Sequence, residues 1–209
     1  MRYRVKICGI TTPEQAVAAA TAGADAIGLV FHPPSRRCVE PGQAAAIVEA
    51  LPPFVTTVGL FVDPDPARVE QVLSAVQLGC LQFHGGESAA ECARFGRPYL
   101  KAVSMSEASD PRPAMDAHPG AQGFLLDSHG GGRSGGSGHR FDWAAIPEAL
   151  HRPWLLAGGL DEDTVREALT HLRPYGVDVS SGVETALGIK DARRMEAFVR
   201  AVRQCEVNE

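Results

Sequence analysis

Short runs of apolar and β-branched residues alternate along this chain with amphipathic stretches of roughly ten residues. Eight of the short runs predict β-strands, each followed by a helical pattern. The predicted strands span residues 4–8, 26–31, 56–61, 80–83, 99–103, 123–126, 154–157 and 177–179. Such regular alternation is typical of repeated βα units around a parallel sheet.

Several helix starts carry a capping or acidic residue, often with a proline in the first turn. They occur at Thr12-Pro13-Glu14, Glu40-Pro41, Asp65-Pro66 and Asp161-Glu162-Asp163. An open doubly wound sheet usually stops at about five or six strands, so eight units favour closure into a barrel. We therefore predict an α/β protein with a single (β/α)8 TIM barrel domain spanning residues 1–209.

One predicted loop is long and rich in glycine. Residues 129–138, after the sixth strand, contain six glycines. The segment could be a linker between domains, but the βα pattern resumes on both sides of it. We expect a loop that covers a ligand site.

Composition narrows the possible partners and location. Hydrophobic residues make up 44% of the chain and charged residues 22%, which is ordinary globular usage. The net charge is −5 and the 20 Lys and Arg residues are scattered, so we expect no nucleic-acid partner. The apolar runs are too short for a membrane span, and the N-terminus has no signal-peptide pattern. The sequence thus predicts a cytoplasmic protein with no membrane partner.

The cysteines and histidines do not suggest a metal or a disulfide framework. Five cysteines stand at irregular spacings without a C-x-x-C pair, and the six histidines other than His84 lack metal-ligand spacing with acidic residues. We expect no catalytic metal.

Reactive groups in such barrels lie at the carboxyl ends of the strands, where Cys8 ends the first one. A lone cysteine in an apolar run is often an inert buried residue. However, Lys6 lies on the same face of the strand, where an ammonium would lower the pKa of the thiol. Gly9 follows and would allow a ligand to approach closely. Cys8 is therefore a candidate base.

Asp127 follows the apolar end of the sixth strand. It could cap a helix or a turn. If its carboxyl is partly desolvated, its pKa rises toward that of a proton donor. A thiolate base and a protonated carboxyl, with opposed pKa shifts, form a pair suited to acid–base isomerisation.

Other polar groups at the strand ends suggest an anionic ligand. Gly158-Gly159 and Ser181-Gly182 follow the last two strands, the position where barrels often bind phosphate through bare N–H groups. The glycine-rich loop could close over the same phosphate. Arg36 and Arg37 could grip a carboxylate, or could be solvated loop charges. His84 could hydrogen-bond a loop or contact the ligand.

Taken together, the motifs resemble one enzyme family along nearly the whole chain. They are KICGIT at 6–11, GADAIG at 23–28, Ser35-x-Arg37, QFHG at 82–85, LLDS at 125–128, GGSG at 135–138, AGGL at 157–160 and VDVSSGVE at 177–184. The chain is similar to phosphoribosylanthranilate isomerases, and KICGIT together with DVSSGVE is specific to them.

The resemblance implies an Amadori rearrangement without a cofactor, in tryptophan biosynthesis. It implies Asp127 as the general acid that opens the sugar ring and Cys8 as the general base at the sugar C2. Arg37 matches the carboxylate-binding arginine, although the adjacent Arg36 leaves an ambiguity of one residue. Phosphate would rest on Gly136, Gly158, Gly159, Ser181 and Gly182, and Asp178 would have a secondary role inside the barrel.

Two other functions remain open at this point. One is a related aminoaldose isomerase of histidine biosynthesis, although such enzymes use an aspartate base on the first strand. The other is a non-catalytic barrel that binds a phosphosugar. The expected partner is a small phosphorylated substrate, and the chain could be a monomer or a homodimer.

Overall fold

The computed structural model describes residues 2–105, 110–128, 143, 146–147 and 149–206. In chain order the strands and helices are β1 (Arg4–Cys8), α1 (Pro13–Ala22), β2 (Ala26–Val30), α2 (Pro41–Glu49), β3 (Thr56–Phe61), α3 (Pro66–Ala75), β4 (Cys80–Phe83), α4 (Ala89–Ala93), β5 (Tyr99–Ser104), α5 (Arg112–Asp116), β6 (Gly123–Asp127), β7 (Trp154–Leu156), α6 (Glu162–His171), β8 (Gly176–Val179), the 3-10 helix η2 (Ser181–Val183), β9 (Glu184–Ala186), β10 (Ile189–Lys190) and α7 (Ala192–Gln204).

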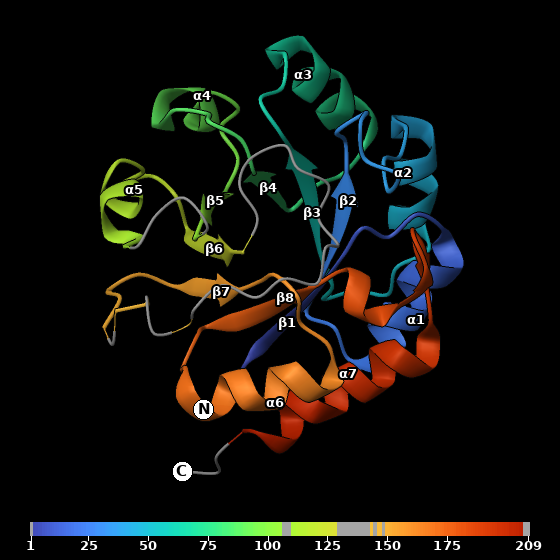
Figure 1. Cartoon of the computed structure of the whole chain (residues 1–209). Coiled ribbons are helices and arrows are strands. Elements are labelled where there is room, and N and C mark those ends of the chain that lie inside the picture. The colour runs from blue at the N-terminus through green and yellow to red at the C-terminus, as the bar shows by residue number, and fades with distance from the viewer. Residues whose placement is uncertain (1, 106–109, 129–142, 144–145, 148, 207–209) are drawn as a thin grey trace.

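Strands β1 to β8 form a closed parallel barrel in chain order, with β8 paired back to β1 (Figure 1). The predicted (β/α)8 barrel is confirmed, and each predicted strand end lies within one residue of the observed one. Because every strand runs in the same direction, all eight carboxyl ends meet at one mouth of the barrel. The reactive groups predicted from the strand ends therefore share that mouth.

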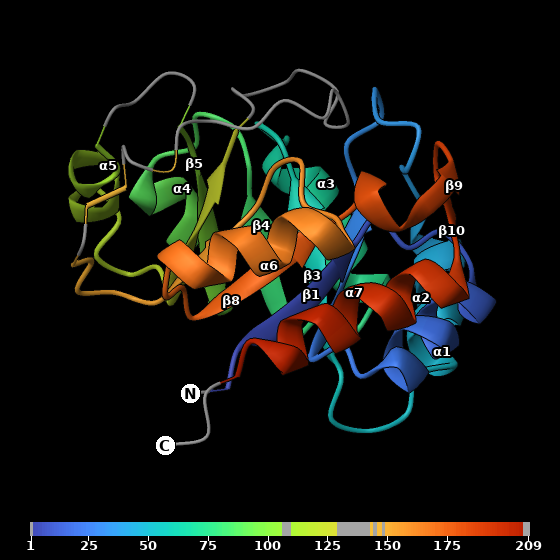
Figure 2. The same cartoon turned by 60° about the horizontal axis from the view of Figure 1, so that its bottom comes forward.

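The helices begin where the sequence predicts. Pro13, Pro41 and Pro66 each occupy a first-turn position, where a missing N–H costs nothing. The Thr12 and Asp65 side chains accept hydrogen bonds from backbone N–H groups of the first turns that follow them. Helices α1 to α7 surround the strands, and α6 lies beside α7 (Figures 1 and 2).

Two regions differ from a simple repeat of βα units. The loop predicted at 129–138, including Gly136, lies outside the described residues, and no α-helix is described between β6 and β7. After β8 the chain forms η2 and the small antiparallel hairpin β9–β10 before α7 begins. The periodicity of the sequence does not predict this hairpin, because strands of two and three residues carry almost no period.

The main apolar core lies between the barrel and the helices. Alternation along each strand sends one set of side chains outward, and aromatic rings from adjacent strands contact each other there. Phe31 stacks on Phe61 with ring centroids 5.3 Å apart, and Phe83 meets Phe61 at 6.3 Å and Tyr99 at 6.0 Å. This packing holds β2 to β5 against their helices.

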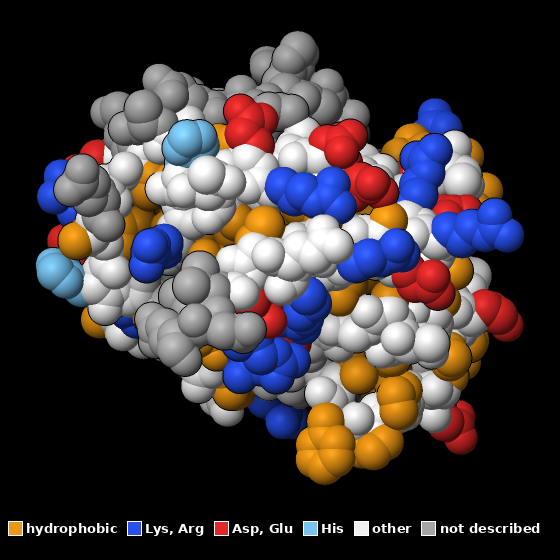
Figure 3. Space-filling view, turned by 90° about the horizontal axis from the view of Figure 1, so that it is seen from below, with side chains coloured by type: hydrophobic (Ala, Val, Ile, Leu, Met, Phe, Trp, Pro, Cys, Tyr) orange, Lys and Arg blue, Asp and Glu red, His pale blue; other side chains and the backbone are white. Residues whose placement is uncertain are grey.

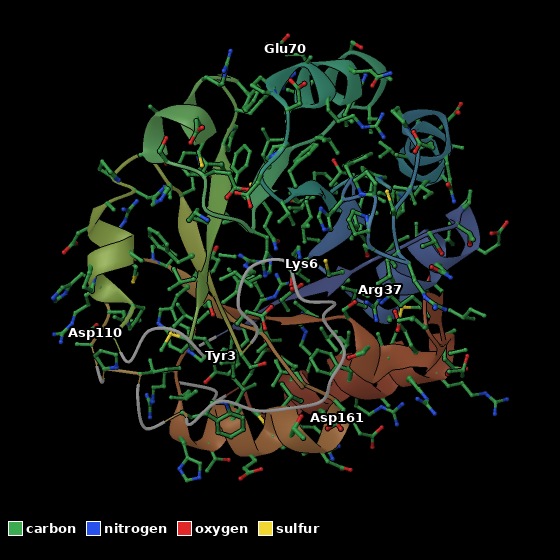
Figure 4. The ribbon with its side chains drawn as sticks, turned by 45° about the horizontal axis from the view of Figure 1, so that its top comes forward. Tyr3, Lys6, Arg37, Glu70, Asp110 and Asp161 are labelled. Atoms are coloured by element: carbon green, nitrogen blue, oxygen red, sulfur yellow. The ribbon has the colours of Figure 1, made fainter. Side chains whose placement is uncertain are left out.

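The inside of the barrel is partly polar. Lys6, Gln82 and Asp178 are buried inward-facing residues of β1, β4 and β8. Figure 4 shows Lys6 within the ring of strands, whereas Glu70 and Asp110 lie at the periphery. Buried polar groups of this kind are costly unless they are paired, so their contacts are central to the site.

The surface carries charges of both signs. On the face in Figure 3, basic and acidic side chains are interspersed.

The two ends of the described chain contact each other. Glu206 accepts a hydrogen bond from the Tyr3 backbone N–H, and Arg203 donates one to the Tyr3 carbonyl. None of the helices in the described part of the chain has the length and apolar character needed to cross a membrane.

Candidate active site

Cys8 and Asp127 are the last residues of β1 and β6, so both lie at the carboxyl end of the barrel. The Cys8 side chain packs with Val30 and Leu60 in a small apolar cluster separate from the main core. Gly28 stands beside Cys8 in the sheet register, and a Cβ at Gly28 would lie 2.7 Å from the Cys8 Sγ. Because Gly28 has no side chain, the Cys8 thiol can occupy this space.

The protonation state of Cys8 differs from the sequence-based expectation. The thiol is 5% exposed, and burial raises its pKa above the ordinary value. Lys6 and Lys190 lower the pKa and Asp178 raises it, but burial prevails. Lys6 therefore acts in the predicted direction, while the predicted net lowering is wrong for the free protein. The resting form at neutral pH is the thiol.

Lys6 is paired inside the barrel. Its Nζ donates a hydrogen bond to Asp178 Oδ1 at 2.7 Å, and the two residues are directly opposite in the β1–β8 register. Burial opposes the charge on Lys6, but Asp178 raises its pKa, so the ammonium persists. Asp178 also interacts electrostatically with Cys8 and with Asp127. It is the group that connects the candidate base with the candidate acid.

Asp127 lies beside His84 at the mouth of the barrel. The His84 Nε2 is 3.3 Å from Asp127 Oδ2, and Ser128 Oγ is 3.5 Å from Asp127 Oδ1. The other ring nitrogen of His84, Nδ1, is 2.9 Å from the amide nitrogen of Gln82. The structure therefore brings the predicted His84 and Asp127 together, and it adds Gln82 behind them.

Arg37 is buried, whereas Arg36 is exposed. The Arg37 guanidinium meets Glu184 in a bidentate pair, with Nε to Oε1 at 2.7 Å and Nη2 to Oε2 at 2.8 Å. Its side chain also fills the space beside Gly9, which the sequence had suggested for a ligand. Arg37 is thus not a solvated loop charge, and two of its nitrogens are already engaged with the protein.

Lys190 completes this buried cluster. Its Nζ donates to Glu184 Oε1 at 2.7 Å and to the Ser180 carbonyl at 3.0 Å, and its side chain has no exposed surface. Ser180 Oγ in turn donates to the Cys8 carbonyl at 3.0 Å. Burial opposes ionisation of Glu184, but Arg37 and Lys190 hold its pKa below the ordinary value. The carboxylate is therefore ionised between two cations.

The glycine turns after β7 and β8 lie against each other. A Cβ at Gly182 would collide with the Leu160 carbonyl oxygen, and one at Gly158 would collide with the Ser128 side chain. Gly158 and Gly159 also have positive φ angles of 86° and 65°, which favour glycine. These contacts bring Gly158, Gly159 and the η2 residues Ser181 and Gly182 to one side of the mouth.

The start of α6 corrects one expectation about this anion site. The Asp161 carboxylate accepts hydrogen bonds from the backbone N–H groups of Asp163 at 3.1 Å and Thr164 at 2.8 Å. Those two groups are capped by the protein itself rather than bare. An anion at this position would meet the glycine turn before α6 and the η2 turn.

The sequence did not single out Gln82, Glu184 or Lys190 as functional residues. Arg37 and Glu184 are 147 residues apart, so no local pattern shows that they pair. Only their presence in the quoted strand-end motifs could have drawn attention to Gln82 and Glu184. Within the part of the chain that the structure describes, no group of three or more His, Cys, Asp and Glu side chains could hold a metal ion.

Comparison with known proteins agrees with this geometry. Residues 5–201 match the family model described as N-(5'-phosphoribosyl)anthranilate (PRA) isomerase. A curated relative from Pseudomonas aeruginosa, named N-(5'-phosphoribosyl)anthranilate isomerase, is 54% identical over 200 residues, covering 96% of this chain and 95% of the relative.

Solved structures give the same result. Phosphoribosyl anthranilate isomerase from Thermus thermophilus has a TM-score of 0.84 and 39% identity, covering 97% of this chain and all of the other. A second isomerase, solved with reduced 1-(o-carboxyphenylamino)-1-deoxyribulose 5-phosphate, has a TM-score of 0.79 and 36% identity, covering 97% of this chain and 99% of the other. The chain therefore belongs to the N-(5'-phosphoribosyl)anthranilate isomerase family.

Proposed function

We propose that Cys8 and Asp127 carry out the family's reaction, the cofactor-free Amadori rearrangement of N-(5'-phosphoribosyl)anthranilate to 1-(2-carboxyphenylamino)-1-deoxyribulose 5-phosphate in tryptophan biosynthesis. The observation that carries this assignment is their shared position. Both residues end strands at one mouth of the barrel, and both interact electrostatically with Asp178. An acid and a base on either side of one substrate can act on neighbouring atoms.

Asp127 acts first, as the general acid. Its proton goes to the furanose ring oxygen, the bond between that oxygen and C1 breaks, and C1 and the anthranilate nitrogen become a protonated Schiff base. Asp127 is left as a carboxylate. His84 Nε2, 3.3 Å from Asp127 Oδ2, can donate a hydrogen bond to that carboxylate. Contacts of this type often tighten only when substrate is bound.

Cys8 acts next, as the general base. Its thiolate takes the proton from C2, and the electron pair forms the C1=C2 bond of an enolamine while the nitrogen regains its lone pair. The enolamine becomes the ketone when C1 gains a proton and the C2 hydroxyl loses one. Although burial raises the pKa of Cys8 in the free protein, the positive Schiff base beside the sulfur would favour the thiolate.

The two anionic ends of the substrate fit the ends of the site. The phosphate would lie at Gly158, Gly159, Ser181 and Gly182, and the carboxylate would meet Arg37. The Nε and Nη2 atoms of Arg37 also pair with Glu184, which fixes the position of the guanidinium at the mouth of the barrel. We propose that Gly136 contributes to the phosphate site from the segment outside the described residues.

Turnover of freshly prepared N-(5'-phosphoribosyl)anthranilate, followed by the loss of anthranilate fluorescence, tests this function. We expect saturable turnover without any added metal or cofactor. Binding of the substrate without turnover would instead support the non-catalytic phosphosugar-binding barrel. The histidine-pathway aminoaldose should be converted poorly or not at all, because β1 ends in Cys8 rather than in an aspartate.

We further propose that residues 1–209 act as one domain in the cytoplasm, either as a monomer or as a homodimer. We expect the site to be complete within one chain. Sedimentation at assay concentrations would give the oligomeric state. If the protein dimerises, equal specific activity at protein concentrations above and below the dissociation constant of the dimer would support a site complete within one chain.

A further inference from the structure

Gln82 is a buried polar residue of the barrel interior whose role is not explained by the reaction alone. The residue has no exposed surface, and its Nε2 lies 2.9 Å from His84 Nδ1. Its Oε1 is buried and has no hydrogen-bond partner among the described residues. A buried amide with an unpaired oxygen costs stability, and an apolar side chain of similar volume would avoid that cost.

The contact with Gln82 determines how His84 can be protonated. A neutral imidazole has one N–H donor and one bare acceptor nitrogen, and the nitrogen that is hydrogen-bonded to a donor must be bare. The Gln82 amide nitrogen is a donor, so Nδ1 is the bare nitrogen and the ring proton is on Nε2. This places the N–H on the nitrogen that lies 3.3 Å from Asp127 Oδ2.

We propose that Gln82 is a positioning residue for the acid step, which holds His84 as a neutral imidazole with its N–H on Nε2, the nitrogen beside Asp127. The inference rests on the proposed role of Asp127 as general acid. A neutral N–H stabilises the carboxylate that forms when Asp127 releases its proton. A positively charged imidazolium would stabilise the carboxylate too strongly. It would keep Asp127 ionised before the reaction, and the acid would then have no proton to give.

Most of the charged groups around His84 are paired with one another. Lys6 and Asp178 inside the barrel form a pair at 2.7 Å, and behind the β4 loop Lys101 pairs with Glu87 at 3.1 Å. Burial favours the neutral thiol at Cys8. Ser128 contributes a hydroxyl rather than a charge. Asp127 lies 3.3 Å from the ring, and Asp178, although paired with Lys6, also interacts electrostatically with it. The Gln82 amide opposes the second ring proton that these carboxylates would attract.

Two variants separate this role from simple packing. Gln82→Met keeps the length of the side chain but removes the donor, and it should fold because it also removes the unpaired oxygen. Gln82→Glu keeps the shape but replaces the donor with an acceptor, which would draw a second proton onto Nδ1. Gln122→Met, at an exposed glutamine outside the site, is the matched control.

Nitrogen-15 NMR of the histidine rings reports the protonation state directly and does not depend on activity. In the wild-type protein we expect His84 to show a bare Nδ1 and a protonated Nε2. At about pH 6.5, the ordinary histidine pKa, Gln82→Glu should show a doubly protonated ring, and Gln82→Met should show a mixture of tautomers. A wild-type ring protonated on Nδ1, or identical rings in all three proteins, would overturn the proposal.

Kinetics give the second readout. We expect kcat to fall at least about tenfold in Gln82→Glu, with a smaller change in KM and an altered dependence of kcat on pH, because the acid step loses its proton donor. Gln122→Met should match the wild type. An unchanged pH profile in Gln82→Glu would also contradict the proposal. If the wild-type protein does not turn over the substrate, the proposed function fails, whereas the NMR result still decides the role of Gln82.

Discussion

Lys6 and Asp178 pair inside the barrel at 2.7 Å and lie directly opposite each other on β1 and β8. Lys6 is on the same face of β1 as Cys8. This relationship sets the electrostatics of the candidate base. Lys6 lowers the pKa of the Cys8 thiol, while Asp178 raises it and also shares the charge of Lys6. Burial outweighs the effect of Lys6 and leaves the thiol protonated in the free protein, while the pair keeps a cation close to it.

The reactivity of Cys8 should consequently depend on pH in a predictable way. In the wild type, alkylation of Cys8 should rise with an inflection above the ordinary cysteine pKa of about 8.5. Asp178→Asn should move the inflection to lower pH, because it removes a negative charge near the sulfur. Lys6→Met should move it higher. Mass spectrometry of the Cys8 peptide measures the rate, and the Cys38 thiol in the same sample serves as the internal reference.

The inflection would remain unchanged in both variants if the pair did not act on the thiol. That result would remove Lys6 and Asp178 from the account of the base.

Removal of either reacting group should lower kcat far more than it raises KM. An acid or base residue typically contributes about 10²–10⁴-fold to the rate, so Cys8→Ser and Asp127→Asn should each lose activity within that range. Steady-state kinetics with N-(5'-phosphoribosyl)anthranilate provide the measurement. Cys38→Ser, at a partly exposed cysteine outside the barrel interior, should behave as wild type. Full activity in Cys8→Ser or Asp127→Asn would refute that residue's assignment.

The two adjacent arginines should differ in their effects. Arg37→Ala should chiefly raise KM, since Arg37 is the buried one at the mouth and would contact the substrate carboxylate. Arg36 is exposed, and Arg36→Ala should change little. Parallel KM measurements on the two variants decide between them. An effect of Arg36→Ala alone would transfer the carboxylate contact to Arg36.

The charge on Glu184 should stabilise the folded protein in a pH-dependent way. The folded-state pKa of Glu184 is lowered by Arg37 and Lys190, so its contribution is present above the unfolded pKa and is lost as the pH falls through the folded pKa. Glu184→Gln leaves two buried cations without their anion and should cost about 3–5 kcal/mol of unfolding free energy at neutral pH.

Denaturant unfolding at neutral and acidic pH measures this cost. The difference between Glu184→Gln and wild type should shrink in acid. Glu40→Gln, which removes an exposed partner of Arg68, should leave the unfolding free energy nearly unchanged. A Glu184→Gln protein as stable as wild type at neutral pH would show that the cluster does not hold the hairpin and Arg37 in place.

The glycines at the phosphate end should tolerate no side chain. Gly158→Ala places a Cβ against Ser128 at a φ of 86°, and we expect a loss of about 1–3 kcal/mol in stability together with a higher KM. Gly42, in α2, has open space around it. Gly42→Ala should instead stabilise the protein by about 0.5–1 kcal/mol. Thermal unfolding of both variants measures the two effects, and we expect them to have opposite signs. Effects of the same sign would contradict the steric role of Gly158.

The sequence predicts the barrel well because strand period, helix caps and first-turn prolines are local features. Thr12, Asp65 and Asp161 each cap the helix that follows within a few residues. It also places Cys8 and Asp127 correctly at the mouth, since parallel strands bring their carboxyl ends together.

The remaining features depend on contacts that no local pattern encodes. The pKa of Cys8 depends on how deeply the folded barrel buries the sulfur, so a nearby Lys6 alone gave the wrong net direction. Arg37 and Lys190 both pair with Glu184, which is 147 residues from Arg37 along the chain. Gln82 and His84 are only two residues apart, but the strand pattern does not indicate which ring nitrogen the amide contacts.

A crystal structure of this protein with reduced 1-(2-carboxyphenylamino)-1-deoxyribulose 5-phosphate would test the assignment of acid and base most directly. We predict that Cys8 Sγ faces the sugar C2 while the Asp127 carboxyl faces the oxygen derived from the furanose ring, with the phosphate at Gly158 and Gly182. An analogue bound with C2 turned away from Cys8, or with both side chains on one side of the sugar, would contradict the account.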